Sequence, residues 1–238
     1  MPDANAIPVI DLGPYLAGEP GALDHAAAEL RHALTEIGFY TIVNHGVPSA
    51  LVHEVYREVA RFHARPLDEK LKIKLDKHNV GYLPIMGDTL RTSVVAHVTK
   101  PNMSEAFFMA RNLAPDHPDV VSGRRFRSAN QWPEGLPGFR EPLVPDAFIV
   151  NGGQLLLRWT NDCFLATPHR AVNRTGGERY ALAFFCDAQI DWPIAAVPTC
   201  VGPVRPPRYE TTYYTDYMIR YQARTYNVFG DQAKDAAE

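Results

Sequence analysis

The sequence has few cysteines, no cluster of basic residues and no long hydrophobic run. Its three cysteines form no Cys-x-x-Cys pair, which argues against a disulfide framework or a zinc site and predicts reduced thiols. The formal net charge of -3 gives no reason to expect binding to nucleic acid or to an anionic membrane. No apolar stretch is long enough to span a bilayer, and no signal-peptide pattern is present. We therefore expect a cytoplasmic, globular protein.

The first part of the chain alternates between strand and helix patterns. Residues 7–12 are apolar but include Pro8, which favours a strand at the edge of a sheet. Residues 22–37 and 49–62 carry apolar side chains at three- and four-residue steps, which is typical of amphipathic helices. Between them, the run FYTIV at residues 39–43 predicts a second strand.

The second part of the chain is richer in loops. Prolines recur through residues 112–141, which predicts a surface connection with at most one short helix. Strand patterns return at residues 146–151, and those at 169–173 and 179–185 predict a hairpin. A terminal helix is expected over residues 213–221.

One histidine and one arginine are the main candidates for a functional site. His169 precedes Arg179 by ten residues. A neutral imidazole can bind Fe(II), and a guanidinium group can hold a carboxylate with two hydrogen bonds. Taken alone, His169 would be interpreted as a core histidine and Arg179 as a strand arginine in a surface ion pair. Their sequence context decides between these interpretations.

That context consists of two ordered blocks of sequence. The first contains GFYTIVNHGV at residues 38–47 and EAFF at 105–108. The second contains DAFIVN at residues 146–151, RWTND at 158–162 and TPHR at 167–170. In this order the blocks resemble the non-haem Fe(II)- and 2-oxoglutarate-dependent dioxygenases of the isopenicillin N synthase-like superfamily.

The resemblance implies an α+β fold, with N-terminal helices packed on a double-stranded β-helix (jelly-roll) core. It implies Fe(II), 2-oxoglutarate as cosubstrate, molecular oxygen and a small organic substrate that is hydroxylated, desaturated or cyclised, or a reaction forming ethylene and succinate. It assigns one iron-binding histidine to His169 and the arginine that pairs with the C5 carboxylate of 2-oxoglutarate to Arg179. Two positions depart from the family pattern: Ala181 replaces a small polar residue, and Gln154 replaces an acidic one.

The resemblance also divides the chain into four parts. Residues 1–120 correspond to the N-terminal non-haem dioxygenase region, 121–141 to a connecting segment, 142–190 to the C-terminal part of the dioxygenase core, and 191–238 to a tail with a helix.

An internal segment of the family is missing from this sequence. Family members carry several strands and a His-x-Asp pair, which supplies the other two iron ligands, before the strand that here begins near Val144. In this chain Glu141 is followed directly by Pro142. We expect on the order of 90 to 100 residues to be absent at this junction and the β-helix core to be incomplete.

One His-x-Asp pattern does occur, at His117 and Asp119. It precedes the run NQWP at residues 130–133, which comes before the sheet core in family members, and its flanking prolines favour an exposed loop over a metal-binding strand. His45, which follows a predicted strand, is interpreted as structural. The chain itself then carries one of three iron ligands, so its status as an enzyme stays open. The alternatives are an oxidoreductase of this lineage and an inactive, internally deleted remnant or small-carboxylate-binding module.

Overall fold

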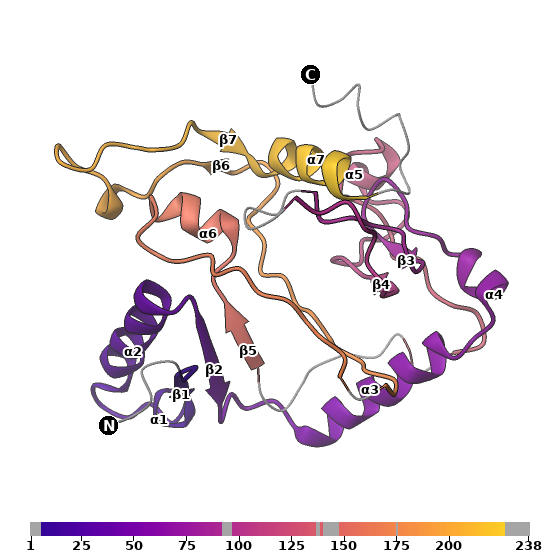
Figure 1. Ribbon diagram of the computed structural model, residues 1–238, viewed down its shortest axis with the longest axis horizontal. Helices are drawn as coiled ribbons and strands as arrows, with labels where there is room; N and C mark the ends of the chain where they lie inside the picture. Colours follow the sequence, from indigo (N-terminus) through magenta and orange to yellow (C-terminus); the bar gives the residue numbers. More distant parts are fainter. Residues whose placement is uncertain (1–5, 92–96, 137–138, 140–147, 175, 227–238) are drawn as a thin grey trace. The chain divides into compact units, whose positions relative to one another are not determined.

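The computed structural model describes residues 6–91, 97–136, 139, 148–174 and 176–226 (Figure 1). The chain forms two compact units. Unit 1 comprises Met1–Tyr56, Pro142–Phe184 and Pro193–Thr212. Unit 2 comprises Arg57–Glu141, Phe185–Trp192 and Tyr213–Glu238. The four-part division of the sequence stays a prediction.

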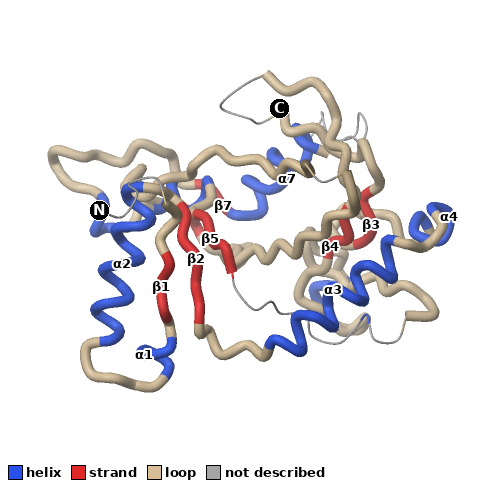
Figure 2. The backbone as a smooth tube through the Cα atoms, turned by 60° about the horizontal axis from the view of Figure 1, so that its bottom comes forward, coloured by secondary structure: helices blue, strands red, loops and turns tan. Residues whose placement is uncertain are grey.

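A three-stranded sheet forms the centre of unit 1. Its strands, in spatial order, are β1 (Val9–Asp11), β2 (Phe39–Val43) and β5 (Phe148–Asn151). β1 runs parallel to β2, whereas β5 pairs with β2 in the antiparallel direction. Figure 2 shows the three strands side by side. β1 is an edge strand, as Pro8 immediately before it predicts.

Helix α2 (Ala22–Glu36) packs on this sheet and buries Ala33 and Leu34. Ile10 of β1 is buried beneath it, with 2% of its surface exposed. The chain leaves α2 through Gly38, whose φ of +79° is the left-handed conformation that glycine adopts readily. The Gly38 amide donates to the carbonyl oxygen of Ala33 (2.8 Å), which closes the helix end.

Shorter elements complete unit 1. They are α1 (Gly13–Leu16), α6 (Gln154–Trp159), β6 (Pro193–Ile194) and the 3-10 helix η2 (Pro198–Cys200).

Unit 2 is built around an aromatic core that follows helix α3 (Ser49–His63). Phe62 at the end of this helix packs with Tyr82, Leu136 and Phe139, all of them buried. The Phe62 and Phe107 ring centroids are 4.9 Å apart. The remaining elements are α4 (Leu67–Leu71), β3 (Gly81–Leu83), β4 (Ala106–Phe108), α5 (Pro118–Val121), β7 (Thr212–Tyr213) and α7 (Tyr214–Thr225).

Most of the locally encoded elements are confirmed, but the predicted hairpin is wrong. In the described residues of 169–185 the structure forms no strand. Phe184 and Phe185 are 84% and 70% exposed, so the apolar side chains that such strands would bury lie uncovered. A strand is stabilised by its neighbours, and local pattern alone does not supply them.

None of the helices in the part of the chain that the structure describes is both long and apolar enough to cross a membrane.

Candidate functional site

The segment that carries His169 is anchored on the end of α2. Leu165 donates its amide to the carbonyl oxygen of Leu34 (2.9 Å), and the Thr167 hydroxyl donates to the carbonyl oxygen of Ile37 (2.5 Å). A Cβ atom on Gly38 would lie 2.4 Å from the Thr167 Oγ1, so a side chain at residue 38 would displace this segment. The end of α2 and the start of β2 therefore set the position of His169.

The hydrogen bond of His169 determines which ring nitrogen is available. Its Nδ1 lies 3.0 Å from the carbonyl oxygen of Thr167, and its ring meets the ring of Phe39 edge-on at 5.0 Å. Because a carbonyl oxygen only accepts, Nδ1 must carry the proton. In the neutral ring Nε2 then keeps its lone pair, which is the arrangement that metal-binding histidines commonly use. His169 is exposed rather than a core residue.

Arg179 lies in the exposed segment that follows. The turn before it is closed by Asn173, whose Nδ2 donates to the carbonyl oxygen of Gly177 (2.6 Å). Arg179 is exposed and forms no ion pair with any residue that the structure describes. Its guanidinium group is therefore open to an anionic ligand.

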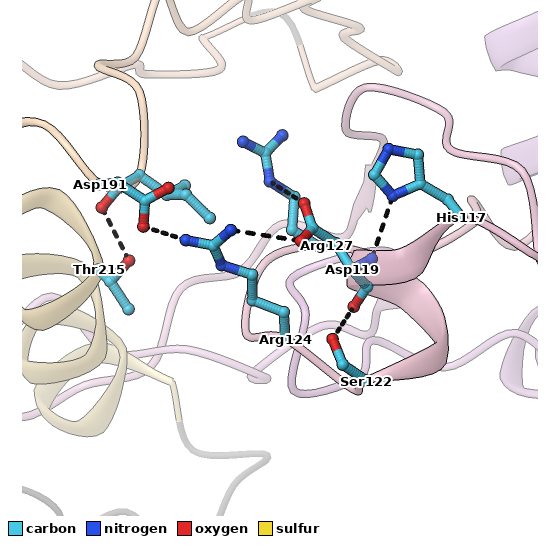
Figure 3. Close-up of polar contacts among 8 residues, drawn as sticks. His117, Asp119, Ser122, Arg124, Arg127, Asp191 and Thr215 are labelled. Carbon is cyan, nitrogen blue, oxygen red and sulfur yellow. Dashed lines mark hydrogen bonds and ion pairs between the residues drawn. The ribbon is translucent and has the colours of Figure 1, made fainter.

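The His117 and Asp119 pair has a different role, shown in Figure 3. His117 caps α5, since its Nδ1 accepts a hydrogen bond from the amide of Asp119 (3.2 Å). The Asp119 carboxylate pairs with Arg124 (3.3 Å) and faces Arg127 (3.8 Å). Arg124 also contacts Asp191. The carboxylate is thus already neutralised by arginines, and the pair stabilises a helical turn in place of the exposed loop that we expected.

His45 also makes structural contacts. Its Nδ1 accepts a hydrogen bond from the amide of Val47 (3.2 Å), and its ring packs against Phe148 with centroids 4.8 Å apart. These contacts fit the structural role that the sequence suggests for His45.

The described residues do not by themselves fit an Fe(II) ion. Among them, no group of three or more His, Cys, Asp or Glu side chains is placed to hold a metal. One imidazole supplies neither the anionic ligand nor the facial geometry of a non-haem iron site. The Glu141–Pro142 junction lies outside the described residues.

A buried polar cluster around Glu105 was not predicted. Its carboxylate accepts hydrogen bonds from Lys70 Nζ (2.8 Å) and the Tyr82 hydroxyl, and lies 3.1 Å from His63 Nδ1. Burial raises the pKa of Glu105, but the bonds from Lys70, Tyr82 and His63 outweigh it and lower the pKa overall. Burial lowers the pKa of His63 and raises that of Tyr82. The only sign of this cluster in the sequence is that Glu105 directly precedes the apolar strand β4.

Comparison with known proteins now places the chain. Residues 7–135 match the family described as non-haem dioxygenase in morphine synthesis N-terminal, and residues 129–188 match the 2OG-Fe(II) oxygenase superfamily. The chain therefore belongs to the non-haem, 2-oxoglutarate- and Fe(II)-dependent oxygenases, as its sequence predicts. Fe(II) is the cofactor of this family, 2-oxoglutarate and molecular oxygen are its cosubstrates, and its substrates are small molecules.

Three similar proteins illustrate the match. The 2-oxoglutarate-Fe(II) type oxidoreductase hxnY of Emericella nidulans is 21% identical, over 98% of this chain and 94% of that protein. Clavatol oxidase claD of Penicillium crustosum is 33% identical, over 60% of this chain and 42% of that protein. A 2OG-Fe(II) oxygenase family protein of Caulobacter crescentus has a TM-score of 0.72 at 18% identity, covering 90% of this chain and 97% of that one. This likeness confirms the double-stranded β-helix fold.

The lengths of these alignments bear on the missing segment. The alignment with hxnY has 333 positions, whereas 98% of 238 residues is about 233. About 100 positions of that alignment therefore have no residue of this chain.

Proposed function

We propose that this protein oxidises a small organic molecule in an Fe(II)- and 2-oxoglutarate-dependent reaction. In this proposal His169 binds the iron through Nε2 and Arg179 binds the C5 carboxylate of 2-oxoglutarate. Its main support is that both residues lie inside the matched oxygenase segment. In addition, His169 Nδ1 donates to the Thr167 carbonyl oxygen, which leaves Nε2 as the nitrogen that can bind a metal.

We also propose that the other two iron ligands belong to the segment that relatives carry where Glu141 meets Pro142. The alignment lengths support this, because about 100 positions of hxnY lack a counterpart in this chain. The contacts of Asp119 with Arg124 and Arg127 support it further, since the Asp119 carboxylate would have to break both contacts in order to bind iron. The active polypeptide would then be longer than 238 residues.

The proposal includes small-molecule partners and a cytoplasmic location. The net charge of -3 supports small molecules over nucleic acid as partners, and the three free cysteines support a reducing compartment.

Succinate formation tests the proposed function. The purified gene product is incubated with Fe(II), ascorbate and 2-oxoglutarate, and succinate is measured by nuclear magnetic resonance. We expect succinate to depend on Fe(II) and to disappear in His169→Ala. Arg179→Ala should weaken 2-oxoglutarate binding by roughly 10- to 100-fold, because it removes a charged, bidentate contact.

Matched controls separate these roles from general damage to the fold. His117→Ala and Arg174→Ala should leave succinate formation unchanged. A loss of activity in His117→Ala would show that the pair at residues 117 and 119 binds metal. A protein that bound 2-oxoglutarate through Arg179 but formed no succinate at any iron concentration would instead be a small-carboxylate-binding module.

A further inference from the structure

Two of the three cysteines lie together in unit 1 although Cys200 is 37 positions after Cys163 in the sequence. Cys163 is in the turn that follows α6, and Cys200 is the last residue of η2. Their side chains are close enough for the Cys200 thiol to affect the pKa of the Cys163 thiol. Both cysteines are partly buried and free. Nothing in their sequence spacing predicts this contact.

Backbone and side-chain bonds hold the segment just before Cys163 against the segment that contains Cys200. Val197 donates its amide to the carbonyl oxygen of Trp159 (2.8 Å). The Asn161 Nδ2 donates to the carbonyl oxygens of Cys200 (3.2 Å) and Pro206 (3.1 Å). Asn161 is completely buried. The approach of the thiols is therefore fixed by groups other than the thiols themselves.

Further bonds tie the Asn161 turn to the residues after Cys200. The amide of Arg208 donates to Asn161 Oδ1 (2.9 Å), and the Arg205 guanidinium donates to the Asn161 carbonyl oxygen (2.8 Å). Asp162 pairs with Arg208 (2.7 Å). A bond between the sulfur atoms would thus join segments that already keep a fixed alignment, so it needs little backbone movement.

The Cys163 thiol ionises less readily than an exposed thiol. Burial, followed by the hydrogen bond with Cys200, raises the pKa of the Cys163 thiol. Cys163 therefore keeps its proton at neutral pH.

We propose that Cys163 and Cys200 form a reversible disulfide when the protein meets hydrogen peroxide or a related peroxide. One of the two sulfur atoms attacks a peroxide oxygen, forms an S–O bond and breaks the O–O bond, and the released hydroxide takes the thiol proton to become water. The other sulfur then attacks this sulfenic acid, forms the S–S bond and expels hydroxide, which leaves as water with the second thiol proton. The two cysteines lose two electrons, and the peroxide is reduced to two waters.

The disulfide would fasten the segment that leads to His169. Cys163 precedes His169 by six residues, and Leu165 and Thr167 between them hold the end of α2. Oxidation would therefore restrict the segment on which the proposed iron ligand lies, without touching that ligand.

Peptide mapping tests the proposal. The reduced, full-length protein is treated with hydrogen peroxide, alkylated with iodoacetamide, and digested with trypsin and a protease that cleaves before aspartate. These cleavages place Cys163 in peptide 162–170, Cys200 in peptide 191–208 and Cys186 in peptide 180–186. We expect a disulfide-linked species that joins peptide 162–170 to peptide 191–208, and dithiothreitol should reduce it to the two separate peptides. Thiol titration in denaturant should fall from three groups to one.

The exposed Cys186 provides a matched control. In Cys186→Ser the same linked peptide should form, and the thiol count should fall from two to none. Cys163→Ser and Cys200→Ser should each abolish the linked peptide. The Cys186→Ser result decides the question even if the other two variants fail to fold. Peroxide that linked Cys186 to another cysteine, or that oxidised Cys163 and Cys200 without joining them, would overturn the proposal.

Discussion

The Glu105 cluster allows a quantitative prediction about what holds unit 2 together. Replacing Glu105 with glutamine keeps the size of the side chain but removes its charge, which leaves the Lys70 ammonium group buried without a carboxylate. The Lys70 side chain is 8% exposed and that of Glu105 is 23% exposed. Breaking a fully buried pair costs about 3–5 kcal/mol, so this partly exposed one should cost about 2–3 kcal/mol of unfolding free energy.

Urea unfolding at neutral pH, followed by fluorescence, measures this loss. Glu69→Gln is the matched control, because Glu69 pairs with Arg65 and Lys72 at 3.0 Å but is 34% exposed. It should cost only about 0.5 kcal/mol. Adding Lys70→Met to Glu105→Gln should recover part of the loss, since it removes the unpaired charge. Equal costs for Glu105→Gln and Glu69→Gln would refute the reasoning.

Three further predictions concern pH and packing. In the folded protein the pKa of His63 is held below its usual 6.5 and that of Glu105 below its usual 4.5. Each group therefore stabilises the fold fully above its usual pKa, and this stabilisation is lost as the pH falls through the lowered pKa of the folded state. Urea midpoints should therefore decline below about pH 6.5 and again below about pH 4.5, and a midpoint that rose on acidification would contradict this. Gly38→Ala should cost about 2 kcal/mol, because alanine disfavours the φ of +79° and its Cβ meets Thr167; an unchanged thermal midpoint would refute this. Asn161→Ala should cost about 2–3 kcal/mol in urea unfolding, because it leaves the carbonyl oxygens of Cys200 and Pro206 without their donor, and a loss under 1 kcal/mol would contradict the role of Asn161.

Elements encoded by local pattern were predictable from the sequence. The apolar periodicity of α2 and α3 and the β-branched and aromatic run of β2 identify them with no knowledge of their neighbours. α7 was predicted for residues 213–221 and extends to Thr225, since helix ends depend on caps and packing more than on periodicity.

Features that depend on distant parts of the chain were not predictable. The hairpin over residues 169–185 has the composition of two strands, yet its strands need partners that local sequence does not specify. The Cys163–Cys200 contact and the Glu105 cluster arise only after separate segments pack. For the candidate site, the sequence identified His169 and Arg179 through family context, whereas the tautomer of His169 required the position of Thr167.

The mass of the polypeptide that forms succinate tests the central claim most directly. The gene product is fractionated by size, and each fraction is assayed for succinate formation with Fe(II) and 2-oxoglutarate. The mass of the polypeptide in each fraction is then measured by intact mass spectrometry. We predict that the active species is about 11 kDa heavier than 26.6 kDa, the mass of about 100 further residues at this chain's average, and that its extra sequence lies between Glu141 and Pro142. Fe(II)-dependent succinate formation by a species of 26.6 kDa would contradict the account.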